Sequence, residues 1–123
     1  MSWLRGVSET EYSDGEMRLF IELQQRKLTL FMVTHRGIEL DYMRDGVKGC
    51  RPDFLWGPPA YTVFLDGERV HRSDHNQRRD GLITQALERR GFTVDRFRYR
   101  PPLSKGKVCA IADAIERHVR EHI

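Results

Sequence analysis

The chain has 123 residues, of which 39% are hydrophobic and 32% are charged. This length suits one domain with one hydrophobic core. No apolar run approaches the ~18 residues of a membrane-spanning helix, and the first residues lack the basic and apolar pattern of a secretion signal. We therefore expect a cytoplasmic protein without a membrane partner, in which the two cysteines are reduced thiols.

The expected elements begin with a lead-in over residues 1–12, followed by a single domain over residues 13–123. Ser13 or Asp14 suits the N-cap of a helix over residues 15–27. Apolar side chains near helical spacing predict that one face of this helix is buried. These side chains are Met17, Phe20, Ile21, Leu23 and Leu28.

Four segments then favour β-structure. Residues 30–34 are β-branched and aromatic enough to predict a strand, with residues 38–43 as its partner or as a loop. Residues 51–56 predict a short strand that contains Asp53. Residues 61–65 form a continuous apolar run, which is typical of a buried central strand.

The last third of the chain predicts a helix, a strand and a second helix. Residues 75–90 have an amphipathic helical pattern that ends at Gly91, and residues 92–99 alternate as a strand does. Residues 107–122 predict the final helix, with a buried stripe of Val108, Ile111, Ala112, Ile115 and Val119. This order of elements predicts an α/β fold with a small mixed β-sheet flanked by helices.

The basic residues are unevenly distributed, although the formal net charge is only +3. Residues 96–107 contain five basic residues and no acidic one, and a second basic group lies within residues 69–79. Basic clusters interleaved with aromatic residues suit a phosphate backbone, and an ordinary solvated surface is the alternative. The residues expected to contact DNA phosphates are Arg69, Arg72, Arg78, Arg98, Arg100, Lys105 and Lys107.

Two carboxylates and a histidine stand in or just after predicted strands. Asp53 lies in an apolar strand, where a carboxylate is costly unless it binds something. Asp66 ends the most apolar strand, and His71 follows in a loop. Two carboxylates could hold Mg²⁺ or Mn²⁺, and a histidine could activate water for attack on phosphorus. The alternative is that Asp66-Gly67 is an ordinary turn and His71 a surface residue.

Four short motifs follow one another in a fixed order: PDF at 52–54, VFLDGERVH at 63–71, NQRRD at 76–80 and RGFTV at 90–94. Asp53 and Phe64 are eleven residues apart, and Gly67 and His71 are four apart. With this order and spacing, the chain resembles the very-short-patch repair endonucleases over about residues 13 to 100. Related homing endonucleases have a similar Glu, Asp, His and Asp arrangement.

The resemblance implies a restriction-endonuclease-like fold and a variant of the PD-(D/E)xK site. Phe64 stands where other nucleases of this plan carry a second acidic residue. Asp53 and the backbone carbonyl of Leu65 would then bind Mg²⁺ directly, and Glu16, which resembles the family's helix glutamate, would hold a water of the metal. We retain Asp66 as a further candidate ligand because of its place at a strand end.

The resemblance also assigns roles after the predicted central strand. His71 would be the catalytic or water-positioning histidine, and Asp80 would orient it by a hydrogen bond. Asp80 as an ordinary helix-surface residue is the alternative. The chain departs from the repair enzymes after the D-G pair, where their aromatic wedge is replaced by Glu68, Arg69 and Val70. Recognition of a mismatch by an inserted ring at this place is therefore not supported.

Three hypotheses remain open from the sequence. The first is a metal-dependent DNA endonuclease or nickase, with specificity supplied by a homodimer, a partner or a fused recognition domain. The second is a non-catalytic nucleic-acid-binding module that retains the nuclease fold. The third is a structural or protein-interaction domain with a basic face. Mg²⁺-dependent cleavage separates the first from the second, and DNA binding at low salt separates the second from the third.

Overall fold

The computed structural model describes residues 13–34, 36–67 and 74–123, and the predicted lead-in lies outside these ranges. At its centre is a three-stranded sheet in the order β3 (Phe54–Trp56), β4 (Tyr61–Gly67) and β5 (Thr93–Tyr99). Strand β3 runs antiparallel to β4, and β5 runs parallel to it. A mixed sheet with the predicted apolar run at its centre confirms the α/β class.

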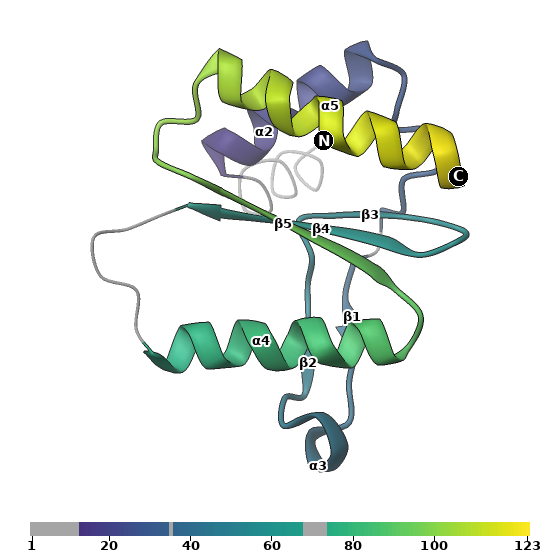
Figure 1. Ribbon diagram of the computed structural model, residues 1–123, viewed down its shortest axis with the longest axis vertical. Coiled ribbons are helices and arrows are strands. Elements are labelled where there is room, and N and C mark those ends of the chain that lie inside the picture. The colour runs from purple at the N-terminus through teal and green to yellow at the C-terminus, as the bar shows by residue number, and fades with distance from the viewer. Residues whose placement is uncertain (1–12, 35, 68–73) are drawn as a thin grey trace, which may run out of the picture.

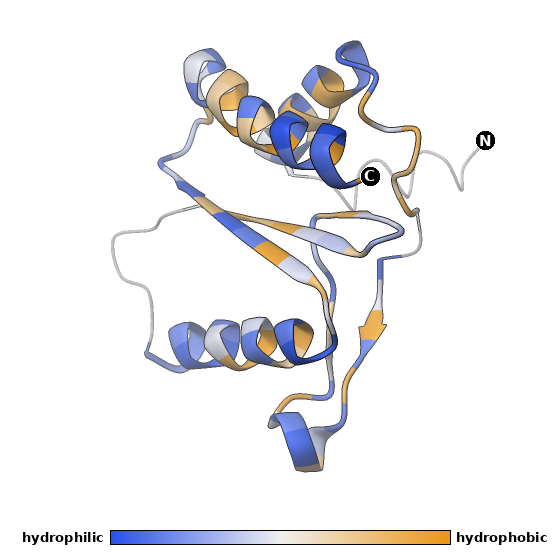
Figure 2. Ribbon diagram, turned by 45° about the vertical axis from the view of Figure 1, so that its right-hand side comes forward, coloured by the Kyte–Doolittle hydropathy of each residue, from blue (hydrophilic) through white to orange (hydrophobic). Residues whose placement is uncertain are grey.

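Helices cover both faces of this sheet (Figure 1). Helices α2 (Asp14–Gln25) and α5 (Lys105–His122) lie on one face, and α4 (Asp74–Arg89) lies on the other. Figure 2 shows that the apolar sides of these helices turn toward the sheet. In the described ranges, no helix is long and apolar enough to cross a membrane. The stripe predicted for the last helix is confirmed, since its buried residues are Val108, Ile111, Ala112, Ile115 and Val119.

The largest side chains of the core lie between the sheet and the α2–α5 layer. The fully buried Trp56 donates its Nε1–H to the Leu28 carbonyl over 2.7 Å. The ring of Tyr61 lies 5.5 Å from that of Trp56 and stacks on His118 at 3.9 Å. A buried indole needs a hydrogen-bond acceptor, so this contact fixes the chain that follows α2 against β3.

Helix α2 begins with a capping box that involves Ser13 and Glu16. The Glu16 backbone N–H donates to Ser13 Oγ over 3.3 Å, and the Ser13 N–H donates to Glu16 Oε2 over 3.2 Å. Ser13 is therefore the predicted N-cap, and the box holds Glu16 at the start of the helix. Leu19 and Leu23 are buried, but Ile21 is 46% exposed. The expected burial of Ile21 was wrong because it lies about half a turn away from those two leucines.

Residues 30–34 do not form the predicted strand. Their contact with the sheet consists of an isolated bridge between Met32 and Trp56, with two hydrogen bonds that join Val33 to Leu55 and Gly57 to Phe31. Leu30 is 80% exposed. The segment follows the edge of β3 without a regular ladder, because β-propensity produces a strand only where a packed face supports it.

Residues 38–50 form a small separate unit beside α4. Strand β1 (Ile38–Glu39) pairs with β2 (Gly49–Cys50), and the short helix α3 (Tyr42–Asp45) lies between them. The expected partner of residues 38–43, the strand over 30–34, is therefore replaced by β2. We call this unit, residues 38–50, the α3 hairpin.

A buried ion pair joins the α3 hairpin to α4. Asp45 is 2% exposed, and its two oxygens accept from Arg89 Nη2 and Arg90 Nη2, each over 2.8 Å. The Arg90 guanidinium, the Asp41 backbone N–H and Arg89 together hold the pKa of Asp45 well below its usual range. The carboxylate is thus charged at neutral pH and fastens the hairpin to the end of α4.

Candidate active site

Asp53 continues the sheet with its side chain. Its backbone N–H donates to the Val63 carbonyl over 3.0 Å, and its Oδ2 accepts from the Leu65 N–H over 2.7 Å. The prediction that Asp53 lies inside the strand was wrong by one residue, since β3 begins at Phe54. In a regular sheet, the Leu65 N–H would donate to a backbone carbonyl of the neighbouring strand. Here it donates to the carboxylate of Asp53, and this hydrogen bond fixes the direction of the Asp53 side chain.

The backbone carbonyl of Leu65 faces the same side as Asp53. The N–H and C=O groups of one strand residue point toward the same neighbouring strand, and the Leu65 N–H points at Asp53. The predicted pair of metal ligands, the Asp53 carboxylate and the Leu65 carbonyl, therefore lies on one side of β4.

The carboxyl group of Glu16 adjoins that of Asp53. Burial raises the pKa of Asp53 to about 7, and the hydrogen-bonded Glu16 carboxyl acts in the same direction, while the Leu65 N–H and Arg36 act against it. Two carboxyl groups this close repel each other once both are ionised. The two carboxyl groups therefore tend to bind a proton at low pH, and at higher pH they suit a metal cation.

Arg36 is a residue of this site that the sequence did not reveal. It is 4% exposed, and its Nη1 donates to the backbone carbonyls of Pro52, over 3.4 Å, and Asp53. A charged group is buried at this depth only when it is paired or hydrogen-bonded. Arg36 therefore fixes the backbone on which Asp53 is carried, and no pattern in its neighbouring residues signals the burial.

Tyr99 is a second residue that sequence reasoning missed. It ends β5 and is paired in register with Gly67 of β4. Burial and the nearby negative charges of Glu16 and Asp53 raise the pKa of Tyr99, and a hydrogen bond with Ser13 lowers it. Its phenol therefore joins the end of β5 to the capping box that holds Glu16. The alternation of residues 92–99 was the signal that could have placed Tyr99 on the α2 side.

The close fit at Tyr99 leads to a prediction about two helical glycines. A Cβ at Gly15 would lie 2.8 Å from Tyr99 Oη, whereas a Cβ at Gly81 in α4 would meet nothing within 4 Å. We expect Gly81→Ala to raise the free energy of unfolding by about 0.5–1 kcal/mol. Gly15→Ala should lower it by about 1–3 kcal/mol because the contact is overpacked. Urea unfolding measures both, and stabilisation by both substitutions would contradict this packing.

Asp66 and Asp80 converge on a different group, the guanidinium of Arg96. Arg96 Nη1 lies 3.7 Å from Asp66 Oδ2 and 4.0 Å from Asp80 Oδ1. Its Nη2 also donates to the Asp80 carbonyl over 3.2 Å, its Nε donates to Thr84 Oγ1 over 2.9 Å, and the group stands 4.2 Å from the centre of the Phe64 ring. Phe64 packs in the cluster under α4, so this group of charges lies on the α4 side of the sheet.

The predicted roles of Asp66 and Asp80 stay predictions. His71, which Asp80 would orient, lies outside the described residues. In the structure, the carboxylates of Asp66 and Asp80 both lie close to the positively charged guanidinium of Arg96. The sequence placed Arg96 in the basic stretch over residues 96–107, but it did not indicate that its guanidinium forms contacts within the protein.

The oxygen donors at Asp53 suit a hard divalent cation. Within residues 13–34, 36–67 and 74–123, no three His, Cys, Asp or Glu side chains gather as a metal-binding group. Mg²⁺, however, is commonly held by one or two carboxylates with waters completing its octahedron. Asp53, the Leu65 carbonyl and Glu16 are a donor set of this kind, so the residues fit Mg²⁺ or Mn²⁺.

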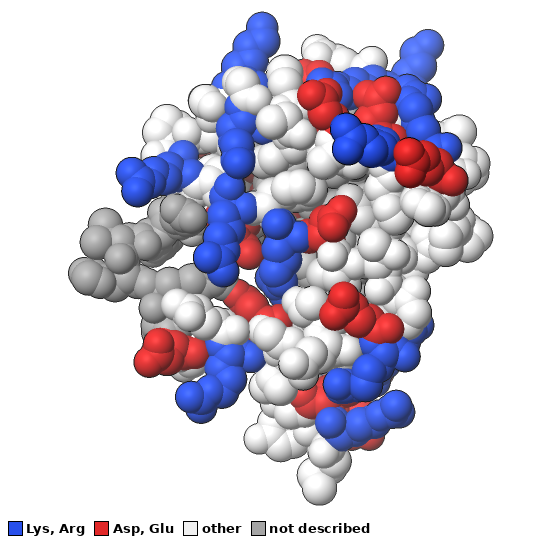
Figure 3. Space-filling model, in the orientation of Figure 1, with Lys and Arg blue, Asp and Glu red and all other residues white. Residues whose placement is uncertain are grey.

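The predicted phosphate contacts are exposed wherever the structure describes them. Arg69 and Arg72 lie outside the described residues, and the exposed ones are Arg78, Arg98, Arg100, Lys105 and Lys107. In Figure 3, basic side chains gather on the face where β5 crosses in Figure 1, with carboxylates between them. This face offers positive charge beside the strand ends that carry Tyr99 and Asp66.

Comparisons with protein families, with curated proteins and with solved structures found no match for this chain. The most informative contact is the one between the carboxyl groups of Asp53 and Glu16, because a half-buried acidic pair is stable only when it shares a proton or binds a cation.

Proposed function

We propose that the protein is a Mg²⁺-dependent DNA endonuclease or nickase, which hydrolyses phosphodiester bonds. The observation that carries this proposal is the half-buried carboxylate of Asp53, held by the Leu65 N–H and adjoined by Glu16. Exposed arginines and lysines on the neighbouring elements provide sites for the phosphate backbone. The proposal is thus supported by two features: a pair of carboxyl groups that suits Mg²⁺, and exposed basic residues that suit the phosphates of DNA.

Each residue of the site has a distinct task in this proposal. Asp53 and the Leu65 carbonyl would hold the cation, and Glu16 would accept a hydrogen bond from water beside it. Arg36 keeps the Asp53 backbone in place. A bound Mg²⁺ supplies Lewis-acid stabilisation of the negative charge that develops on the phosphate. His71 would take the proton of the attacking water, which is the role proposed for it from the sequence motif.

The first test is nicking of supercoiled plasmid by the purified chain, with Mg²⁺ and with EDTA. We expect Mg²⁺-dependent conversion to the open circle, and a loss of about 10²- to 10⁴-fold in His71→Ala, the range typical of a general base. His122→Ala is a matched control, because His122 lies at the end of α5 and contacts His118. The control should cut at the rate of the unmodified protein.

The other outcomes decide between the remaining functions. Salt-sensitive DNA binding without any Mg²⁺-dependent cleavage would favour the non-catalytic binding module. Absence of DNA binding at low salt would leave a protein-interaction domain. If cleavage occurs, the ratio of nicked to linear product reports whether one active site acts alone or two act in a homodimer or with a partner.

A further inference from the structure

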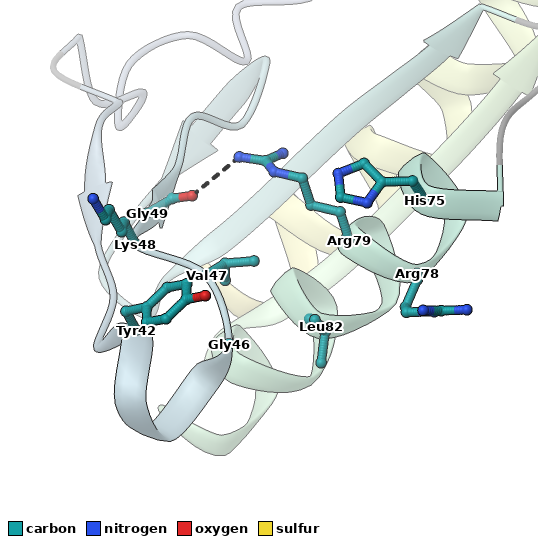
Figure 4. Close-up of a pocket in the computed structure, with 9 residues that line it drawn as sticks. All are labelled: Tyr42, Gly46, Val47, Lys48, Gly49, His75, Arg78, Arg79 and Leu82. Atoms are coloured by element: carbon teal, nitrogen blue, oxygen red, sulfur yellow. Dashed lines mark hydrogen bonds between the residues drawn. The ribbon is translucent and has the colours of Figure 1, made fainter.

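A pocket of about 420 Å³ lies between the α3 hairpin and α4, away from the Asp53 site. Its volume falls in the range of pockets that bind small organic groups. Figure 4 shows Tyr42 and Val47 of the hairpin facing α4, and His75 and Arg79 of α4 facing the hairpin. The buried pair of Asp45 with Arg89 and Arg90 holds the two walls together.

The polar part of the lining is basic. Lys48, Arg78, Arg79 and His75 line the pocket, and none of its lining residues is acidic. Arg79 Nη2 contacts the Gly49 carbonyl at 3.5 Å, which is the upper limit for a hydrogen bond and uses one of five guanidinium donors. The nearby carboxylate of Asp45 is engaged by two arginines. The pocket therefore suits an anionic group.

The remaining wall is apolar and aromatic. Tyr42 is 59% exposed, and Leu82 lies across the pocket from it. An exposed aromatic face beside clustered cations is the combination by which proteins bind single-stranded nucleic acid, with the base on the ring and the phosphate on the cations. A phosphate alone would not need the ring, and an apolar ligand would not need the cations.

We propose that this pocket takes one unpaired nucleotide of a DNA strand, with its base between Tyr42 and Leu82 and its phosphate at Arg79 and His75. The proposal deepens the proposed function, since it rests on DNA as the substrate. His75 of the lining follows the predicted catalytic His71 by four residues in the sequence. Because the pocket would hold an unpaired base, the enzyme should bind DNA that carries one in preference to fully paired DNA.

The test compares a duplex that carries one unpaired 2-aminopurine nucleotide with the fully paired duplex, in EDTA so that nothing is cleaved. We expect the chain to bind the first duplex about tenfold more tightly, with stacking on Tyr42 changing the 2-aminopurine fluorescence. Tyr42→Ala should remove this preference and leave the affinity for the paired duplex unchanged. Met43→Ala is the matched control, since Met43 is the next residue of α3, is 91% exposed and is not part of the lining.

A second variant tests the phosphate contact. Arg79→Ala should weaken binding of the unpaired duplex and reduce the slope of log affinity against log salt by about one, the value for one lost phosphate contact. Its effect on the paired duplex should be smaller. An equal loss on both duplexes would show that Arg79 contacts the duplex backbone and would overturn its place in the pocket.

The results separate this proposal from the proposed function. Cleavage without a preference for the unpaired base, or a preference that survives Tyr42→Ala, overturns the pocket and leaves the nuclease. A preference lost in Tyr42→Ala without Mg²⁺-dependent cleavage supports the pocket and overturns the nuclease. Deoxyadenosine monophosphate that binds as tightly as the strand would make this a small-ligand site and overturn the assignment to DNA.

Discussion

Asp53→Asn is expected to reduce Mg²⁺-dependent nicking by at least about 10³-fold, because losing a metal ligand removes several kcal/mol of transition-state stabilisation. DNA binding should change little, since the exposed basic residues remain. The fold should also remain, because the asparagine carbonyl can still accept from the Leu65 N–H, which Asp53 Oδ2 does over 2.7 Å. Initial rates of plasmid nicking and binding in EDTA measure the two effects separately.

The same substitution should stabilise the protein above neutral pH. Burial raises the pKa of Asp53 from 3.8 to about 7. The folded state therefore binds more protons than the unfolded chain between these values, and the contribution of Asp53 to stability is lost as pH rises through about 7. Asparagine does not titrate, so Asp53→Asn should unfold at a higher temperature than the unmodified protein at pH 8 and not at pH 4.

Magnesium supplies the complementary readout. Added Mg²⁺ should raise the unfolding temperature of the unmodified protein at pH 8 and have little effect on Asp53→Asn, since a ligand stabilises only the state that binds it. Glu16→Gln is the companion variant, because glutamine at this position preserves the capping box while removing the second charge. It should lower the pKa of Asp53 and move the low-pH limb of nicking to lower pH. Equal Mg²⁺ shifts in all three proteins would show that the cation binds elsewhere.

The parts of the fold that the sequence predicted are those where apolar residues recur at helical spacing or form a continuous run in a buried element. The five apolar positions of α5 and the apolar run of β4 are of this kind, and their burial is confirmed. The segment over residues 30–34 did not form a strand because most of its apolar side chains are not packed: Met32 packs against the core, but Leu30, Phe31 and Val33 are exposed. Composition predicts which residues favour a strand, while pairing depends on partners distant in the chain.

The candidate site shows the same division. The resemblance placed Glu16 and Asp53 in one site, and the structure brings their carboxyl groups together, while their roles toward a metal stay predictions. Arg36 and Asp45 were beyond prediction, since charged residues are rarely buried and their burial depends on partners elsewhere in the chain, the Asp53 backbone and the end of α4. Sequence shows where charges are, but three-dimensional contacts decide which of them are neutralised.

Arg96 and Arg98 show this difference on a single strand and allow a paired test. Arg96 lies between Asp66 and Asp80 with its side chain 21% exposed, whereas Arg98, two residues further along β5, is exposed. We expect Arg96→Ala to lower the free energy of unfolding by about 2–4 kcal/mol, because two partly buried carboxylates lose their shared cation. Arg98→Ala should change it by less than about 0.5 kcal/mol.

DNA binding should depend on the two arginines in the reverse order. Arg98→Ala removes an exposed arginine that is proposed to contact phosphate, so it should reduce the salt slope of DNA binding by about one. Arg96→Ala, tested where the variant is still folded, should leave that slope nearly unchanged. Urea unfolding and binding titrations at several salt concentrations measure both effects on both variants. Two arginines that behave alike in both measurements would contradict the division of β5 into an internal cation and a DNA contact, because that division depends wholly on the Arg96 contacts to Asp66, Asp80 and Phe64.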